Sequence, residues 1–201
     1  MAYVMAFSYD SRPIQTLLNQ IRNINKRDGI DLQPEYQRGY IWSSDFKDKL
    51  LYSIIKCYPI GNISLRVRTE KNPKGAMQEV VDGQQRLTTV YKFIENEYIQ
   101  SEISKDIIRY IVEYMDGDTD EKLSKLKRKL NNKGKVAISF KQLPQAIQDN
   151  ILAYNISITN ITNASDDEIT EYFRYLQNQE RLRAGELLNS IPDTALEKYL
   201  N

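Results

Sequence analysis

The chain has 201 residues, enough for one domain of ordinary size whose core needs no disulfide or metal. Its 28 lysines and arginines nearly balance 27 acidic residues, so the net charge of +1 gives no overall attraction to nucleic acid or to an anionic membrane. The absence of histidine excludes His-containing catalytic triads, HNH nucleases and His-ligated zinc. The single cysteine, Cys57, excludes an internal disulfide, and we expect a cytoplasmic protein without a membrane span.

Hydrophobic spacing predicts two helices in the first 60 residues. The first covers about 14–21, with Ser11 as its expected cap. A proline and several aromatic residues then favour an extended stretch over 32–42. The second helix runs over about 44–57 and ends before a proline and a glycine.

A β-hairpin follows these helices. Apolar and polar residues alternate over 63–68, residues 72–75 have turn chemistry, and a second strand returns over 77–81. The returning strand ends in Asp82-Gly83, and helical spacing continues from there to about Tyr98.

The second half of the chain reads as mostly helical. Residues 107–114 fit a strand or a helix, and 156–161 form a candidate strand. Helical periodicity is found over 120–131, 145–152, 165–177 and 184–191. A further helix begins at Pro192-Asp193 and is cut off by the chain end, so we expect the amino-terminal fragment of a longer protein.

The densest chemical signal is the string VVDGQQR at 80–86, where the strand meets the helix. Backbone N–H groups at a helix start form an anion site, and Gly83 lets a phosphate approach the main chain. Arg86 opposes the helix dipole there, at a cost of up to about 1 kcal/mol unless an anion shares the site. The alternative is that Asp82 caps the helix and pairs with Arg86. The amides of Gln84 and Gln85 need partners at a buried corner, which slightly favours the functional interpretation.

Two other segments have weaker signals. In the string PEYQRGYIW at 34–42, Arg38 could stack on a base and bind phosphate, but it could equally stack on Trp42 to hold the segment over the core. On residues alone the structural interpretation of Arg38 is the better one. The string at 172–179, followed by Leu182 and Glu186-Leu187, reads as helix core plus a solvated face.

Two nucleic-acid hypotheses arise from charged residues. A basic stretch at 122–135 could contact DNA through Lys125, Arg128 and Lys129, although a charge run is usually the solvated face of a helix. A PD-(D/E)xK-like nuclease is suggested by Pro34-Glu35 with 45–47, but the second group lies in a predicted helix rather than a strand. We therefore reject the nuclease hypothesis and keep DNA contact as a minority alternative.

The order of these motifs resembles a known family. PEYQRGYIW, a helix, a hairpin, VVDGQQRLTTV and a distal YFRYLQNQERLRAGELL are similar to the domain of unknown function 262, over about 11–190. That domain is the nucleotide-hydrolysing amino-terminal part of GmrSD-type modification-dependent restriction and phage-defence systems. The resemblance implies an α+β fold with a small mixed sheet of ParB/sulfiredoxin-like type and added helices. It also implies a single domain over 1–201, with a core at about 11–100 and a mostly helical part at 101–201 packed on it.

The resemblance also implies a site and partners. Transferred by motif, the catalytic residues are Asp82, Gln85 and Arg86, with Asp82 also the candidate Mg²⁺ ligand. The implied nucleotide-binding residues are Gln37, Arg38, Gly83, Gln84, Gln177 and Asn178. Many members have Leu-Asn where Leu176-Gln177 stands here, so this third box either binds differently or only supports the others.

The implied function is a nucleoside triphosphatase without a Walker A loop, regulating an HNH-type nuclease module in the same or another chain. The chain has no histidine and should not cut DNA alone. Three other hypotheses stay open at this point: a ParB-like module that senses DNA modification without turnover, a structural subunit that positions the nuclease, and self-association.

Overall fold

A five-stranded mixed sheet forms the centre of the protein. The computed structural model describes residues 4–34, 42–95, 102–103, 105–115, 121–130 and 136–176. The strand order is β1 (Ala6–Pro13), β7 (Asn155–Thr162), β3 (Ile63–Val67), β4 (Gln78–Asp82) and β2 (Ile30–Asp31). The β1–β7 and β3–β4 pairs are antiparallel, and the β7–β3 and β4–β2 pairs are parallel. The expected α+β class with a mixed sheet is confirmed, and the ParB-like type stays a prediction.

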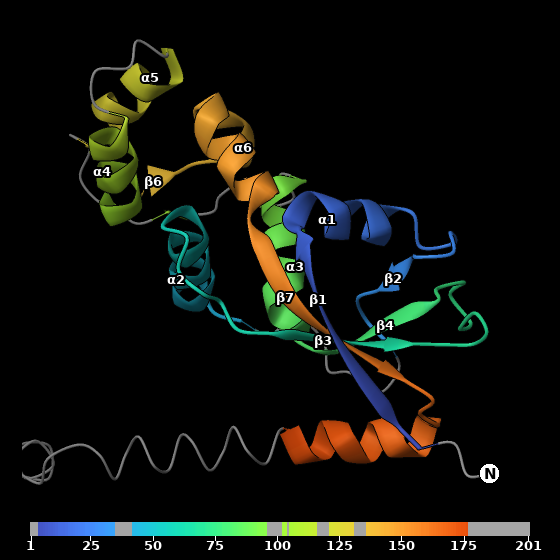
Figure 1. The fold of residues 1–201 in the computed structure, drawn as a ribbon. Helices are drawn as coiled ribbons and strands as arrows, with labels where there is room; N and C mark the ends of the chain where they lie inside the picture. Colours follow the sequence, from blue (N-terminus) through green and yellow to red (C-terminus); the bar gives the residue numbers. More distant parts are fainter. Residues whose placement is uncertain are drawn as a thin grey trace, which may run out of the picture.

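Most helices lie on one face of this sheet (Figure 1). They are α1 (Ile14–Arg22), α2 (Ser44–Ile55), α3 (Gln84–Ile94), α4 (Lys105–Tyr114), α5 (Glu121–Leu130), the short η1 (Phe140–Gln142) and α6 (Gln145–Ala153). A two-stranded sheet of β5 (Glu102–Ile103) and β6 (Val136–Ala137) joins this layer. The main core lies between this layer and the sheet, where Leu17, Leu65 and Leu87 are fully buried. Among the described residues, no helix has the length and apolar character needed to cross a membrane.

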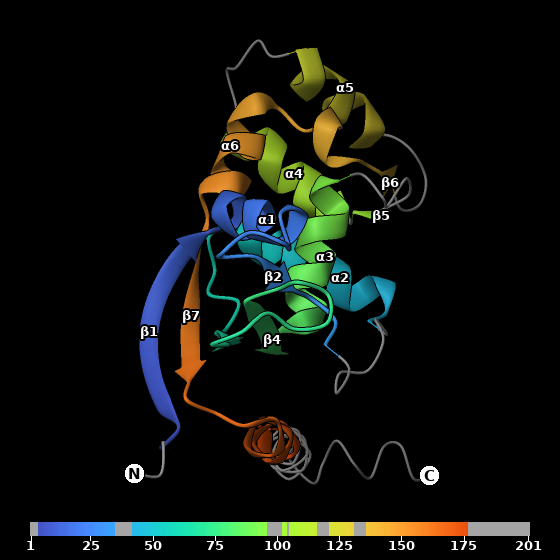
Figure 2. The same cartoon turned by 90° about the vertical axis from the view of Figure 1, so that its right-hand side faces the viewer.

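Among the described residues, a helix over 166–176 lies on the opposite face of the sheet (Figures 1 and 2). A capping box begins this helix, because Glu168 accepts from the Ser165 backbone N–H at 2.8 Å and the Glu168 N–H donates to the Ser165 hydroxyl at 3.3 Å. Ile169 packs with Val81 and Ile161 in a second, smaller apolar cluster. Helix 166–176 therefore brings a distant part of the sequence onto strands β3 and β4.

The predicted hairpin, the helix after Ser44 and the helix after Gly83 are all confirmed. Residues 107–114 lie in helix α4, which settles the ambiguous segment. The prediction for Ser11 is wrong, because Ser11 pairs with Ser157 inside strand β1 and helix α1 has no side-chain cap. The sheet also takes β7 from the second half of the chain, between β1 and β3.

Several predicted segments lie outside the described residues. The structure describes 32–34 and Trp42 of the stretch over 32–42, but not the residues between them. The predicted helices at 184–191 and from Pro192 also lie outside the described residues.

Candidate functional site

The turn from β4 into α3 leaves an uncapped helix start. Gly83 is the N-cap residue, with φ 86° and ψ 11°, and no side chain caps the helix. This left-handed conformation suits glycine, and a Cβ at this position would lie 2.9 Å from Cγ1 of Ile63. The first N–H groups of a helix have no intrahelical acceptor. The corner therefore presents backbone donors where the sequence predicted an anion site.

Arg86 is held beside this helix start by two acceptors. Its Nη1 donates to the Ile60 carbonyl at 2.8 Å, and its Nη2 donates to Asp82 Oδ2 at 2.9 Å. The Arg86 side chain is 18% exposed and that of Asp82 is 35% exposed. The pairing predicted by the structural alternative is therefore present, but its capping role for Asp82 is not. Because the guanidinium is fixed on two sides, its position is set before any ligand arrives.

The two glutamines of the motif have different surroundings. The Gln85 side-chain oxygen accepts the Trp42 backbone N–H at 3.3 Å, so the last residue of the 34–42 string reaches the corner. Gln84 is only 7% exposed, and within the part of the chain that the structure describes its side-chain amide has no hydrogen-bond partner. A buried amide without a partner costs about 1–3 kcal/mol. Such a group calls for an explanation, and a bound ligand is one.

A second wall of the corner comes from helix 166–176. Ser64 is paired with Asp82 in the β3–β4 register, beside a register shift between Ser64 and Leu65. Tyr172 packs against Val81, the residue before Asp82, in the smaller apolar cluster. Burial raises the pKa of Tyr172, the polar side chain of Ser64 lowers it, and the charge of Asp82 raises it. The sequence predicts only helix core plus a solvated face for the segment that holds Tyr172, and no local pattern indicates a position beside Asp82.

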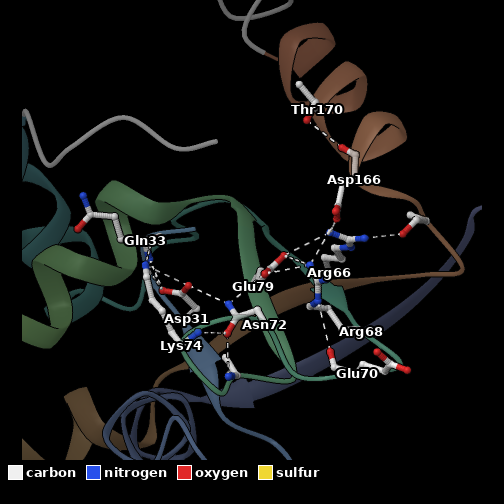
Figure 3. Close-up of polar contacts among 12 residues, drawn as sticks. Asp31, Gln33, Arg66, Arg68, Glu70, Asn72, Lys74, Glu79, Asp166 and Thr170 are labelled. Atoms are coloured by element: carbon white, nitrogen blue, oxygen red, sulfur yellow. Dashed lines mark hydrogen bonds and ion pairs between the residues drawn. The ribbon is translucent and has the colours of Figure 1, made fainter. Parts of the chain in front are cut away.

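A charged cluster lies next to this wall, on the same face of the sheet (Figure 3). Glu79 is 3% exposed and interacts with Arg66 at 3.5 Å, Arg68 at 3.2 Å and Asn72 at 3.0 Å. The cluster consists of Asp31, Arg66, Arg68, Asn72, Lys74, Glu79 and Asp166. Because each buried charge in it is paired, we interpret the cluster as structural. The sequence indicated only that Arg66 and Arg68 share the polar side of the hairpin.

The described residues contain no group of three acidic, cysteine or histidine side chains that could hold a metal by itself. Asp82 is a single carboxylate and already binds Arg86. Mg²⁺ is commonly bound by one or two carboxylates together with the phosphates of a substrate. Asp82 therefore fits the predicted Mg²⁺ only as one ligand beside a bound phosphate.

The α5 basic set, Lys125, Arg128 and Lys129, lies far from this corner (Figures 1 and 2). Leu123 and Leu126 of the same helix are buried, and Lys125 pairs with Glu121 at 2.7 Å. This is the arrangement expected of a solvated helix face.

The other predicted site residues are accounted for as follows. Asp45 and Lys47 lie in helix α2, as the rejection of a nuclease assumed. Four predicted nucleotide-binding residues lie outside the described residues: Gln37, Arg38, Gln177 and Asn178. The structure brings together Asp82, Gly83, Gln84, Gln85 and Arg86 at one corner.

Comparison with known proteins places this chain in a family. The model of the family described as "GmrSD restriction endonuclease, N-terminal domain" matches residues 14–191, which include every element from α1 to β7. No curated protein and no solved structure matches the chain. The family model covers most of the 201 residues, and the expected resemblance is confirmed. The chain therefore belongs to the N-terminal domain family of GmrSD restriction endonucleases, the domain of unknown function 262, and is a module of a restriction or defence system.

Proposed function

We propose that this domain binds and hydrolyses a nucleoside triphosphate at the β4–α3 corner and thereby regulates a nuclease module in the same or another chain. The observation that carries the proposal is the buried side-chain amide of Gln84, which has no partner in the described part of the chain and lies at an uncapped helix start. Backbone N–H groups and a polar amide together suit phosphate oxygens, which accept hydrogen bonds and are negatively charged.

Arg86 supplies the positive charge of the proposed site. Its guanidinium is largely buried and keeps its position through Ile60 and Asp82. A charge fixed in advance stabilises the negative charge that develops during phosphoryl transfer, without a cost of rearrangement. Arg86, which forms an internal ion pair with Asp82, would thus also serve the reaction.

Asp82 is the proposed group for orienting water. Its Oδ2 binds Arg86, and no hydrogen bond from a described residue to its Oδ1 is found. In hydrolysis, water attacks the γ-phosphorus and the bond to the bridging oxygen breaks, which yields a nucleoside diphosphate, phosphate and a proton. Mg²⁺, bound through Asp82 and the phosphates, would supply charge neutralisation.

Titration calorimetry of the chain with Mg·ATP, Mg·GTP, Mg·CTP and Mg·UTP, together with a phosphate-release assay, tests this proposal. We expect one or more of the four to bind and to be hydrolysed. Gln84→Met keeps the size and helix propensity of the side chain but removes the amide, and we expect it to weaken binding about tenfold or more. The proposal fails if the wild-type chain binds none of the four, or if Gln84→Met binds as well as wild type.

A further inference from the structure

We propose that helix 166–176 forms one side of the Asp82 site and contributes to its reaction. In this arrangement Tyr172 is a positioning residue that acts on Asp82, and Asp166 holds the helix on the sheet. This inference rests on the proposed function, because it assigns residues outside the VVDGQQR string at 80–86 to the same reaction. It concerns a part of the chain that follows Asp82 by some 90 positions.

The ion pairs at the start of the helix hold it on the sheet. Arg66 Nη1 lies 2.5 Å from Asp166 Oδ1, and Arg68 Nη1 lies 3.4 Å from the same oxygen (Figure 3). Arg66 Nη2 also donates to the Ala164 carbonyl at 2.8 Å, so Arg66 also binds the segment that leads into the helix. Arg66 itself is held in place by an ion pair with the buried side chain of Glu79. The guanidiniums form a rigid receptor for the exposed carboxylate of Asp166.

The middle of the helix packs on the same face. Ile169 is fully buried against Val81 and Ile161, and Tyr172 lies at the edge of this cluster with its ring 6.0 Å from that of Phe7. Residues 166, 169 and 172 are spaced three apart and therefore share one side of a helix. The ion pair and the apolar contacts together set where Tyr172 lies.

The Tyr172 end of the contact between helix 166–176 and the sheet lies at the Asp82 site. Ser64 and Asp82 are paired on adjacent strands, and Tyr172 packs against Val81, the residue before Asp82. Asn62 donates to the Ser64 hydroxyl at 3.4 Å. Tyr172 thus lies next to Val81 and Asp82, on the face of the sheet away from helices α1 and α3 (Figure 1). A hydroxyl there restricts the side chain and the water molecules around Asp82.

Three variants of the full chain test this arrangement. Tyr172→Phe removes the hydroxyl and keeps the ring, and Asp166→Asn removes the charge that binds the arginines. Asp167→Asn is the matched control, because it makes the same change at the next residue, for which no ion pair is found in the described part of the chain. Turnover is measured with whichever of Mg·ATP, Mg·GTP, Mg·CTP and Mg·UTP wild type hydrolyses fastest, and amide hydrogen exchange is measured across 166–176.

We expect Tyr172→Phe to lower kcat about three- to tenfold, with KM within about twofold of wild type and unchanged hydrogen exchange. Asp166→Asn should increase exchange across 166–176 and lower kcat by a similar factor, while Asp167→Asn should do neither. Rates equal to wild type in both Tyr172→Phe and Asp166→Asn would overturn the inference and leave the proposed function standing. A wild-type chain that hydrolyses none of the four triphosphates would overturn both. Exchange in Asp166→Asn that matches wild type would overturn the fastening role of Asp166.

Discussion

Replacement of Gln84 by methionine should make the protein more stable and less able to bind nucleotide. Gln84 is 7% exposed, and its amide has no partner in the described part of the chain. Methionine has a similar unbranched shape and a similar helix propensity, so the substitution mainly removes the polar group. A residue kept at a cost in stability is typical of a binding site.

The size of this effect follows from the burial of the amide. An unpaired buried polar group costs about 1–3 kcal/mol. For a domain of about 200 residues, each kcal/mol moves the melting temperature by roughly 2–4 °C. We therefore expect Gln84→Met to melt about 2–12 °C above wild type in a thermal scan without nucleotide, and to lose the further increase that Mg·NTP gives wild type.

Gln148 provides the matched control. It is also buried, at 9% exposure, but its Nε2 donates to the Leu143 carbonyl at 2.7 Å. Gln148→Met should lose about 1 kcal/mol and melt roughly 2–4 °C below wild type. If Gln84→Met also melts below wild type, the Gln84 amide is satisfied in the free protein, for example by water, and the reasoning from an unpartnered amide is refuted.

Four further predictions concern the corner and its surroundings. Asp82→Asn should keep Mg·NTP affinity within about threefold, because the amide oxygen still accepts from the arginine, while phosphate release should fall at least about tenfold; unchanged release would remove Asp82 from the mechanism. Gly83→Ala should lower the free energy of unfolding in urea by about 1–2 kcal/mol from its φ of 86° alone, with more from the contact with Ile63, and an unchanged midpoint would contradict this. The hydrogen bond from Arg66 lowers the pKa of Asp166 below its usual 3.8, so the ionised carboxylate contributes fully to helix docking when the pH is well above 3.8. This contribution is lost as the pH falls through the lowered pKa. Hydrogen exchange of 166–176, corrected for intrinsic rates, should therefore match at pH 8 and pH 5 and increase near pH 3. Charge reversal of the α5 basic set should leave duplex DNA binding unchanged in a fluorescence anisotropy salt series, and loss of a steep salt dependence would instead identify a DNA-binding face.

Local sequence rules predicted the corner well. Strict alternation over 63–68 and turn residues at 72–75 are sufficient for a hairpin, and Gly83 marks the point where period two gives way to helical spacing. The same residues, 80–86, form the candidate site in the structure, because strand, turn and helix are contiguous there. Features of this kind depend on neighbours in sequence, which a pattern records.

Features that depend on distant contacts were not predictable. Strand β1 is exposed over Ala6–Ser11 and gives no alternating apolar signal, so the sequence predicts a helix cap at Ser11 instead of a strand. Arg66 shares the polar side of the hairpin, yet it is 7% exposed because helix 166–176 covers it. The place of Tyr172 beside Asp82 likewise depends on β7 lying between β1 and β3, which no local pattern records.

Nuclear magnetic resonance titration of the ¹⁵N-labelled 23.5 kDa chain with Mg·NTP tests the location of the phosphates most directly. The account predicts that the backbone amides of Gln84, Gln85 and Arg86 and the side-chain amide of Gln84 shift most and saturate together, because these donors would bind the phosphate oxygens. It predicts much smaller shifts for the α5 basic set. Saturable shifts centred elsewhere, with the amides of 84–86 unchanged, or no shifts with any of the four nucleotides, would contradict it.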